Sequence, residues 1–194
     1  MDEEPKTTSE VFDVWAKTGR AEGMEKGHLR VAADILAAIP VENKRFLDVG
    51  CGNGWAAAHA FERGASVSAI DGSPEMVRLA RARLPEADIR VGDFADLPWP
   101  PGQFDILWSM EALYYANDPD EVIEEMQRVA KEIHVLMDYF EENAASESWP
   151  DDVGVSMVRR SMQEWRQSFS HEGWKVSTKR IADTLYISAR SSNG

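Results

Sequence analysis

The sequence predicts an α/β fold, a three-layer sandwich around a mostly parallel sheet that ends in an antiparallel hairpin. Five apolar, strand-like runs alternate with helical segments, a glycine-dense turn follows the first run, and two more strand-like runs close the chain. Alternating strands and helices imply right-handed crossovers and therefore parallel strands. With 194 residues, the chain has room for one such domain with a substantial core, but not for two.

The parallel part of the sheet is predicted from apolar runs that are bounded by helix start and stop signals. A helix is expected over residues 29–39, because its apolar residues form one stripe and Pro40 interrupts it. Later helices begin where a capping residue precedes a proline, as at Ser73-Pro74 and Asp118-Pro119. The five strand-like runs are residues 46–49, 66–70, 88–91, 104–109 and 133–138.

The last part of the chain predicts one helix and one hairpin. Apolar residues recur at three- and four-residue intervals over residues 153–169, which is typical of an amphipathic helix. Residues 174–179 and 184–190 are strand-like and are separated by only a few residues. They should therefore form an antiparallel hairpin, which brings the sheet to seven strands.

Composition and charge exclude several classes of function. The chain carries 34 acidic and 21 basic residues, a formal charge of −13, and no lysine- and arginine-rich stripe, so direct nucleic-acid binding is not expected. The single cysteine, Cys51, has no internal disulfide partner, which favours a reducing, cytoplasmic location. Neither a membrane-spanning run nor a secretion signal is recognisable, so no membrane association is expected.

The most informative motif is the turn that follows the first predicted strand, where glycines stand at 50, 52 and 54. Glycine tolerates positive φ angles and close approach of a ligand to the backbone, and the helix that follows leaves free N–H groups. A dinucleotide-binding turn has the spacing G-x-G-x-x-G. Here the spacing differs, and an acid, Asp48, stands two residues before Gly50. This turn resembles the first motif of class I S-adenosylmethionine (SAM)-dependent methyltransferases.

The resemblance extends over about residues 30–190 and implies a Rossmann-like domain that binds SAM and releases S-adenosylhomocysteine. We expect residues 1–28 to form an amino-terminal cap or lid and residues 29–194 to form the single methyltransferase domain. One departure concerns the fifth strand, which the family usually precedes with a glycine pair. Here residues 128–132 run directly into Ile133, so this turn must be short.

The predicted cofactor contacts follow the strands in order. Asp71 ends the second strand, where its carboxylate could accept hydrogen bonds from both ribose hydroxyls, although an NAD site would use such an acid equally well. By the resemblance, Asp93 would accept the adenine amine, Phe94 would contact the ring, and Arg20 of the lid would pair with the methionine carboxylate. The full predicted set is Asp48, Gly50, Cys51, Gly52, Gly54, Asp71, Gly72, Met76, Asp93, Phe94, Ser109 and Arg20.

Methyl transfer from a sulfonium is an in-line displacement, so the protein mainly aligns the reactants and excludes water, and no metal is expected. An acceptor that starts protonated must lose a proton, and the candidate catalytic residues are Glu111, Tyr115 and His28. Aromatic side chains near the expected pocket could surround a planar or cationic acceptor. The candidate substrate contacts are Trp15, Trp55 and Tyr114.

The sequence therefore predicts a methyltransferase that acts on a small molecule, as a monomer or homodimer. Three alternatives stay open. The first is an RNA- or protein-directed methyltransferase whose partner subunit supplies the missing basic surface. The second is a SAM-binding protein without catalysis, and the third is a nicotinamide-dependent oxidoreductase, which the glycine spacing disfavours.

Overall fold

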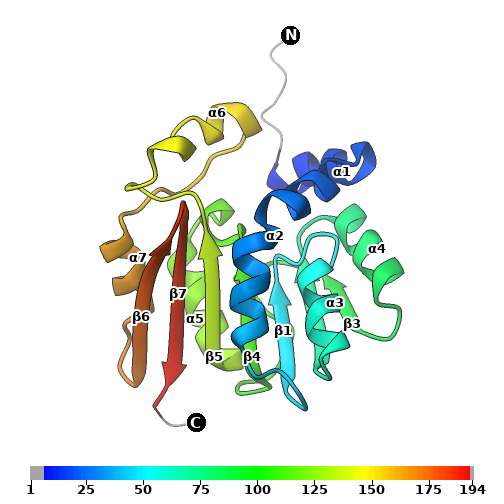
Figure 1. The fold of residues 1–194 in the computed structure, drawn as a ribbon, viewed down its shortest axis with the longest axis vertical. Helices are drawn as coiled ribbons and strands as arrows, with labels where there is room; N and C mark the ends of the chain where they lie inside the picture. The colour runs from blue at the N-terminus through cyan, green and yellow to red at the C-terminus, as the bar shows by residue number, and fades with distance from the viewer. Residues whose placement is uncertain (1–6, 193–194) are drawn as a thin grey trace.

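The computed structural model describes residues 7–192, and the side chains of all of these except residues 23–29. Its seven strands form one sheet in the order β3-β2-β1-β4-β5-β7-β6 (Figure 1). The first five strands are parallel, and β7 runs antiparallel to both of its neighbours, which confirms the predicted fold class. The strands are β1 Arg45–Val49, β2 Ser66–Asp71, β3 Asp88–Val91, β4 Phe104–Met110, β5 Ala130–Met137, β6 Trp174–Ile181 and β7 Thr184–Ser191.

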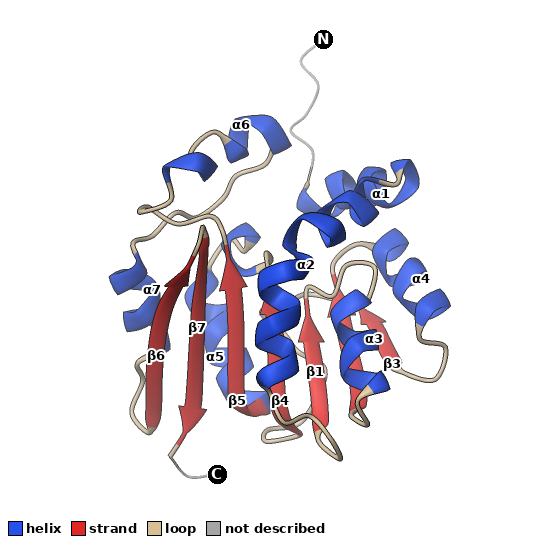
Figure 2. Ribbon diagram, in the orientation of Figure 1, coloured by secondary structure: helices blue, strands red, loops and turns tan. Residues whose placement is uncertain are grey.

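Helices cover both faces of this sheet (Figure 2), and α1 and α6 lie beyond the carboxyl ends of the parallel strands (Figure 1). Within residues 7–192, no helix is both long and apolar enough to cross a membrane. The helices are α1 Thr8–Thr18, α2 Arg20–Ala38, α3 Trp55–Glu62, α4 Pro74–Arg83, α5 Pro119–Val129, α6 Trp149–Val153 and α7 Met162–Phe169, with 3₁₀ turns at Leu113–Tyr115 (η1) and Ala144–Ser146 (η2).

The core forms two layers because successive strand residues point to opposite faces. Phe46 of β1 packs in the layer that contains Leu36 of α2 and the apolar residues of α3 and α4. Its neighbour Leu47 packs in the other layer, against the apolar stripes of α5 and α7. The central strands are buried on both faces, which explains why they appear in the sequence as continuous apolar runs.

The first long helix starts earlier than the sequence predicts. Gly19 has φ +74°, a conformation that glycine adopts readily, and it both ends α1 and precedes α2. From there α2 runs as one helix from Arg20 to Ala38. The helix therefore passes through the predicted boundary at residues 28 and 29, and the cap shares a helix with the domain.

The prediction of one helix over residues 153–169 is wrong. Gly154, with φ +77°, ends α6, and Ser161 starts α7 as an N-cap that forms a capping box with Glu164. Residues 154–161 between these helices, called the strap below, lie across the end of the sheet, and Val158 N donates to Tyr114 O at 2.8 Å. The apolar periodicity that predicted a single helix belongs to two short helices and the strap.

The short turn expected before the fifth strand is confirmed, since α5 ends at Val129 and β5 begins at Ala130. The N–H of Ala130 still donates to Met126 O, while its own φ of −127° and ψ of 156° are already extended. Helix and strand therefore meet without an intervening residue, and no glycine is needed.

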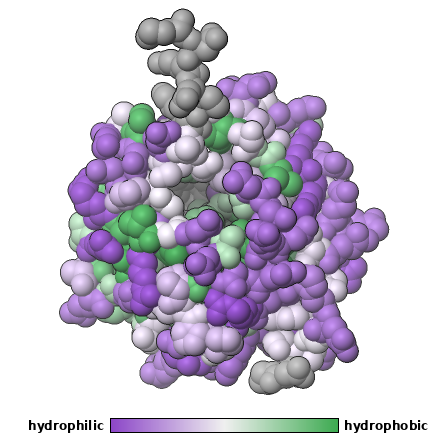
Figure 3. Space-filling model, turned by 180° about the vertical axis from the view of Figure 1, so that it is seen from behind, coloured by the Kyte–Doolittle hydropathy of each residue, from purple (hydrophilic) through white to green (hydrophobic). Residues whose placement is uncertain are grey.

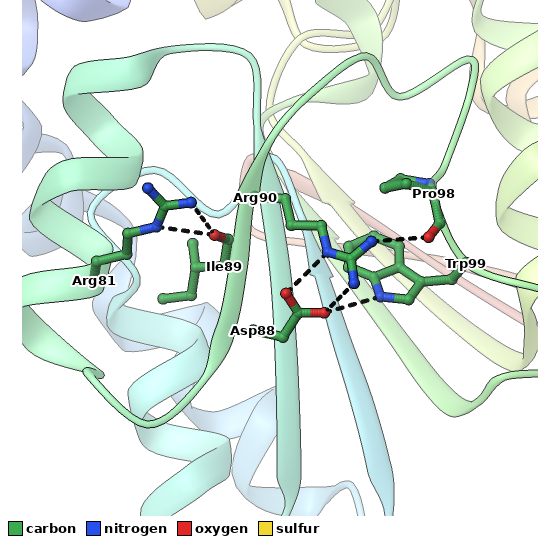
Figure 4. Close-up of polar contacts among 6 residues, drawn as sticks. All are labelled: Arg81, Asp88, Ile89, Arg90, Pro98 and Trp99. Carbon is green, nitrogen blue, oxygen red and sulfur yellow. Dashed lines mark hydrogen bonds and ion pairs between the residues drawn. The ribbon is translucent and has the colours of Figure 1, made fainter.

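Charged side chains cover the outer edge of the sheet at β3 (Figure 4). The guanidinium of Arg81 donates to Ile89 O at 2.6 and 3.0 Å. On the same strand, Arg90 pairs with Asp88 at 2.7 Å and lies over the ring of Trp99, 4.7 Å from its centroid. Charges on an edge strand hinder pairing with another strand, so this edge is protected over part of its length.

Candidate functional site

A cavity of about 670 Å³ lies at the carboxyl edge of the parallel strands. Its floor is formed by the turn after β1, the ends of β2 and β4, and the loop at residues 92–94. Its roof is formed by Thr7, Thr8, Ser9 and Phe12, together with Val155 and Ser156 of the strap. The space-filling view in Figure 3 shows a hollow in the upper half of a largely hydrophilic face. The volume is in the range of small-molecule and cofactor sites.

The three glycines of the first turn have different roles. Gly50, Gly52 and Gly54 all have positive φ angles, of 74°, 53° and 78°. A Cβ on Gly50 would lie 2.3 Å from the Cβ of Ala112, and a Cβ on Gly54 would lie 2.9 Å from that of Ala80. A Cβ on Gly52 would meet nothing within 4 Å. Gly50 and Gly54 therefore permit close packing of the protein on itself, while Gly52 leaves space beside the cavity.

Asp71 holds the floor of the cavity together. One carboxylate oxygen accepts a hydrogen bond from Gly52 N at 2.8 Å, and the other accepts from Ser73 N at 2.9 Å. Each oxygen keeps a lone pair for a further donor. Burial raises the pKa of Asp71 to about 6, against the lowering effect of these two N–H donors. The carboxylate that ends β2 is thus fixed in position and lines the cavity.

Asp48 lies behind the turn, only 2% exposed, and does not line the cavity. Burial raises the pKa of Asp48 to about 8, and the negative charge of Asp71 adds to this effect. Burial also raises the pKa of the Cys51 thiol well above its ordinary value, so Cys51 is no thiolate nucleophile at neutral pH. In the ligand-free protein, Asp48 is therefore largely protonated below pH 8.

We expect the free energy of unfolding of the ligand-free protein to fall between about pH 4 and pH 8, since folded Asp48 keeps a proton that the unfolded chain releases. This contribution is fully present below the unfolded pKa of 3.8 and is lost as the pH rises through about 8. Asp48→Asn should reduce the fall by about 2 kcal/mol or more. Urea unfolding at pH 5 and pH 8 measures it, with the exposed Asp34→Asn as the control. An equal fall in both variants would contradict the prediction.

The loop after β3 brings Phe94 and Asp93 to the cavity. The Phe94 ring lies 3.6 Å from the position of a Cβ on Gly50, so it faces the glycine turn. Asp93 is exposed, and its carboxylate accepts a hydrogen bond from Ala95 N at 3.0 Å, which shapes the loop. A Cβ on Gly92 would lie 2.9 Å from Ile70 Cδ1, so the end of the Ile70 side chain would have to shift to accommodate it.

Glu111 follows β4 in an unusual backbone conformation, with φ +51°. It is 6% exposed, its N–H donates to Leu136 O at 2.9 Å, and its carboxylate accepts a hydrogen bond from the Tyr114 hydroxyl at 2.6 Å. It lines both the large cavity and a second cavity of about 60 Å³, to which Arg30 also contributes. A left-handed, non-glycine residue in a pocket wall is strained, and such residues are common at functional sites.

The aromatic candidates divide between the cavity and the core. Tyr115 and Trp55 line the cavity, and burial raises the pKa of Tyr115, so its phenol is protonated at neutral pH. Tyr114 is 1% exposed and lies behind Glu111 rather than in the lining. Trp15 packs in the cluster between α1 and α4, with the Arg20 guanidinium 3.9 Å from its ring centroid.

The structure thus brings most of the predicted residues together. Those that line the cavity are Gly50, Cys51, Gly52, Trp55, Asp71, Gly72, Met76, Asp93, Phe94, Glu111 and Tyr115. Those that do not are Asp48, Gly54, Ser109, Arg20, Trp15 and Tyr114. The predicted role of His28 concerns a side chain outside the described residues. Sequence reasoning missed Ser9, Phe12, Asn53, Ser73, Asn117 and the strap residues Val155 and Ser156, of which Ser73 had a signal, since it precedes Pro74 as a helix cap.

Comparison with known proteins agrees with this geometry. Residues 47–135 match the family described as a methyltransferase domain. The magnesium-protoporphyrin O-methyltransferase of Rhodobacter capsulatus is 35% identical over 104 residues, which are 50% of this chain and 46% of that protein. The chain thus spans about half the length of the curated relatives it matches.

Solved structures match over more of the chain. A chain in the complex between the Haloferax volcanii Trm112 methyltransferase activator and a methyltransferase superposes with a TM-score of 0.87 and 33% identity, over 93% of this chain and 97% of that chain. The SAM-bound magnesium protoporphyrin IX methyltransferase of Synechocystis PCC 6803 superposes with a TM-score of 0.68 over 87% of this chain and 82% of that one, and its 15% identity supports the fold alone. The glycine turn, the strand order and the similarity over nearly the whole chain lead to one conclusion, that this protein belongs to the class I SAM-dependent methyltransferases.

Proposed function

We propose that the protein transfers a methyl group from SAM to a small-molecule acceptor by in-line displacement. The observation that carries the proposal is the 670 Å³ cavity, where the open backbone at Gly52, the fixed carboxylate of Asp71 and the loop at residues 92–94 meet. These are the three positions at which the sequence predicts contacts to SAM. A roof over the cavity supports a reaction from which water is excluded.

The residues present fit this cofactor. Gly52 leaves open space, Asp71 retains acceptor capacity on both oxygens, and the Phe94 ring offers an apolar wall. We propose that Asp71 holds the sugar and that Asp93 and Phe94 hold the base. The amino-acid part would lie along the glycine turn. When bound, SAM supplies a methyl group that is activated by the positive charge on sulfur.

The described side chains that line the cavity include three carboxylates, those of Asp71, Asp93 and Glu111. Their charge favours a cationic or neutral acceptor over an anionic one. Phe12 and Tyr115 meet edge to face at 5.1 Å between ring centroids and add an apolar surface near Glu111. We therefore propose an amine or hydroxyl acceptor with an apolar body.

Glu111 is the side chain that we propose accepts the acceptor's proton. Glu111→Gln keeps the size of the side chain and an oxygen for the Tyr114 hydroxyl, but it cannot take up a proton. We expect the rate of methyl transfer to fall by about a hundredfold or more, with S-adenosylhomocysteine binding unchanged. Single-turnover label transfer and calorimetry measure the two effects, and Glu62→Gln on the exposed face of α3 is the control. An unchanged transfer rate would contradict this role.

The proposed reaction is tested with methyl-labelled SAM and fractionated cell extract. Label in the small-molecule fraction supports it, while label only in RNA or protein supports an alternative acceptor class. Binding of SAM without transfer to any fraction would favour a non-catalytic role. Thermal unfolding with SAM or NAD separates the cofactors, because a bound ligand raises the melting temperature.

One comparison favours a second candidate, an enzyme that needs an activating partner. The similar Haloferax volcanii chain was solved with the Trm112 methyltransferase activator, at 33% identity to this protein. We propose as the alternative that this chain requires such an activator and, with it, methylates RNA or protein. Co-expression with and without a Trm112-type protein, followed by label transfer, tests the alternative. Activity in RNA or protein fractions only after co-expression would support it.

A further inference from the structure

A carboxylate of α1, the helix whose first residues help to roof the cavity, is hydrogen-bonded to the loop that forms part of the floor. Asp13 of α1 accepts a hydrogen bond from the Ser73 hydroxyl at 2.5 Å and a second one from Glu75 N at 3.1 Å. Nearby on the same helix, the Ser9 hydroxyl donates to Gly72 O at 2.8 Å. Asp13 thus satisfies an N–H in the first turn of α4, although it is about 60 residues away in sequence.

The same loop carries the carboxylate that we assign to the cofactor. Ser73 N donates to Asp71, and Asp71 accepts in turn from Gly52 N. The Ser73 hydroxyl accepts from Met76 N at 3.1 Å while it donates to Asp13, so it caps α4 and binds α1 at once. A continuous series of hydrogen bonds therefore runs from Asp13 of α1, through Ser73 and Asp71, to the glycine turn.

Apolar packing alone would leave the position of α1 less well defined. Val11 and Trp15 pack with Met76 of α4 and Val155 of the strap, and such contacts are not directional. The hydrogen bonds of Asp13 are directional, and they set where α1 stands along α4. This position matters because Phe12, next to Asp13, lines the cavity.

We propose that Asp13 is a positioning residue that locks α1 over the cofactor through Ser73 and Glu75. Asp13 does not line the cavity, so it would act on a bound molecule only through other residues. Its effect is to slow the exit of the bound nucleoside and to keep Phe12 against it. The inference rests on the cofactor part of the proposed function, and it adds a residue to which neither the sequence motifs nor the comparisons assign a role.

The kinetic test compares the exit of S-adenosylhomocysteine from three full-length variants, by stopped-flow tryptophan fluorescence after displacement with SAM. Asp13→Ala should release it about tenfold faster than the wild type. Asp13→Asn should restore slow release, because its amide oxygen can accept from both donors. Asp34→Ala, an exposed aspartate on α2, is the matched control and should behave as the wild type.

A second measurement needs no ligand. In hydrogen exchange of the free protein, the amides of residues 8–18 should exchange faster in Asp13→Ala than in Asp13→Asn or in the wild type. If Asp13→Ala releases S-adenosylhomocysteine at the wild-type rate and its α1 amides exchange at the wild-type rate, the positioning role of Asp13 is overturned. The proposed function would stay intact. If the wild type does not bind S-adenosylhomocysteine at all, the proposed function and the positioning role of Asp13 both fail.

Discussion

Gly50→Ala is expected to destabilise the protein by about 3 kcal/mol, which lowers the melting temperature of a chain of this size by about 10 °C. Two effects add. Position 50 has φ +74°, which an alanine adopts only with strain, and the new Cβ would lie 2.3 Å from the Cβ of Ala112. The Cβ of Ala112 is fixed by its own backbone, so the loop after β4 must move away from the turn.

Two further variants separate these effects. Gly102→Ala places a Cβ at φ +65° with nothing within 4 Å, so it measures the cost of the conformation alone, about 1 kcal/mol. The double variant Gly50→Ala with Ala112→Gly removes the colliding atom and should recover the remainder. Thermal and urea unfolding check the series. If Gly50→Ala loses no more stability than Gly102→Ala, the close approach of the turn to Ala112 does not limit the fold.

Asp71→Ala is expected to weaken the binding of S-adenosylhomocysteine by a hundredfold or more. The substitution removes the acceptor that we propose for both ribose hydroxyls, and it also leaves Gly52 N and Ser73 N without their acceptor. Hydrogen bonds to a charged group contribute about 1.5–3 kcal/mol each, and a factor of ten corresponds to about 1.4 kcal/mol. Titration calorimetry measures the affinity, and circular dichroism checks that the variant is folded.

Matched variants make this result specific. Asp71→Asn keeps one acceptor oxygen and should bind with intermediate affinity. Asp96→Ala removes an exposed carboxylate from the loop after β3 and should bind as the wild type does. Equal affinity of Asp71→Ala and Asp96→Ala would remove the sugar-binding role from Asp71.

The sequence predicted that the floor residues lie close together, because each of them belongs to a short local segment. The turn at residues 50–54 comes directly after β1, and Asp71 is the last residue of β2. Parallel strands bring their carboxyl ends to one edge of the sheet. Element type and order at β1, β2 and β4 were therefore sufficient to place these residues around one cavity.

The roof could not be predicted in the same way, because it depends on contacts between distant segments. Phe12 and Val155 both line the cavity although they are far apart in sequence, and neither belongs to a motif. The apolar periodicity over residues 153–169 gave the wrong local structure, although Ser161 and Glu164 form a capping box that could have signalled a helix start. Trp15 and Tyr114 were expected at the substrate, but aromatic residue type alone does not separate pocket lining from core.

The location of Thr7 has a practical consequence for work with this protein. Thr7 lines the cavity at one end of the sheet, whereas β7 ends at the opposite end (Figure 1). A bulky label attached at Thr7 itself would stand beside the mouth of the pocket and compete with an incoming acceptor. Affinity tags and immobilisation linkers are therefore better attached after β7.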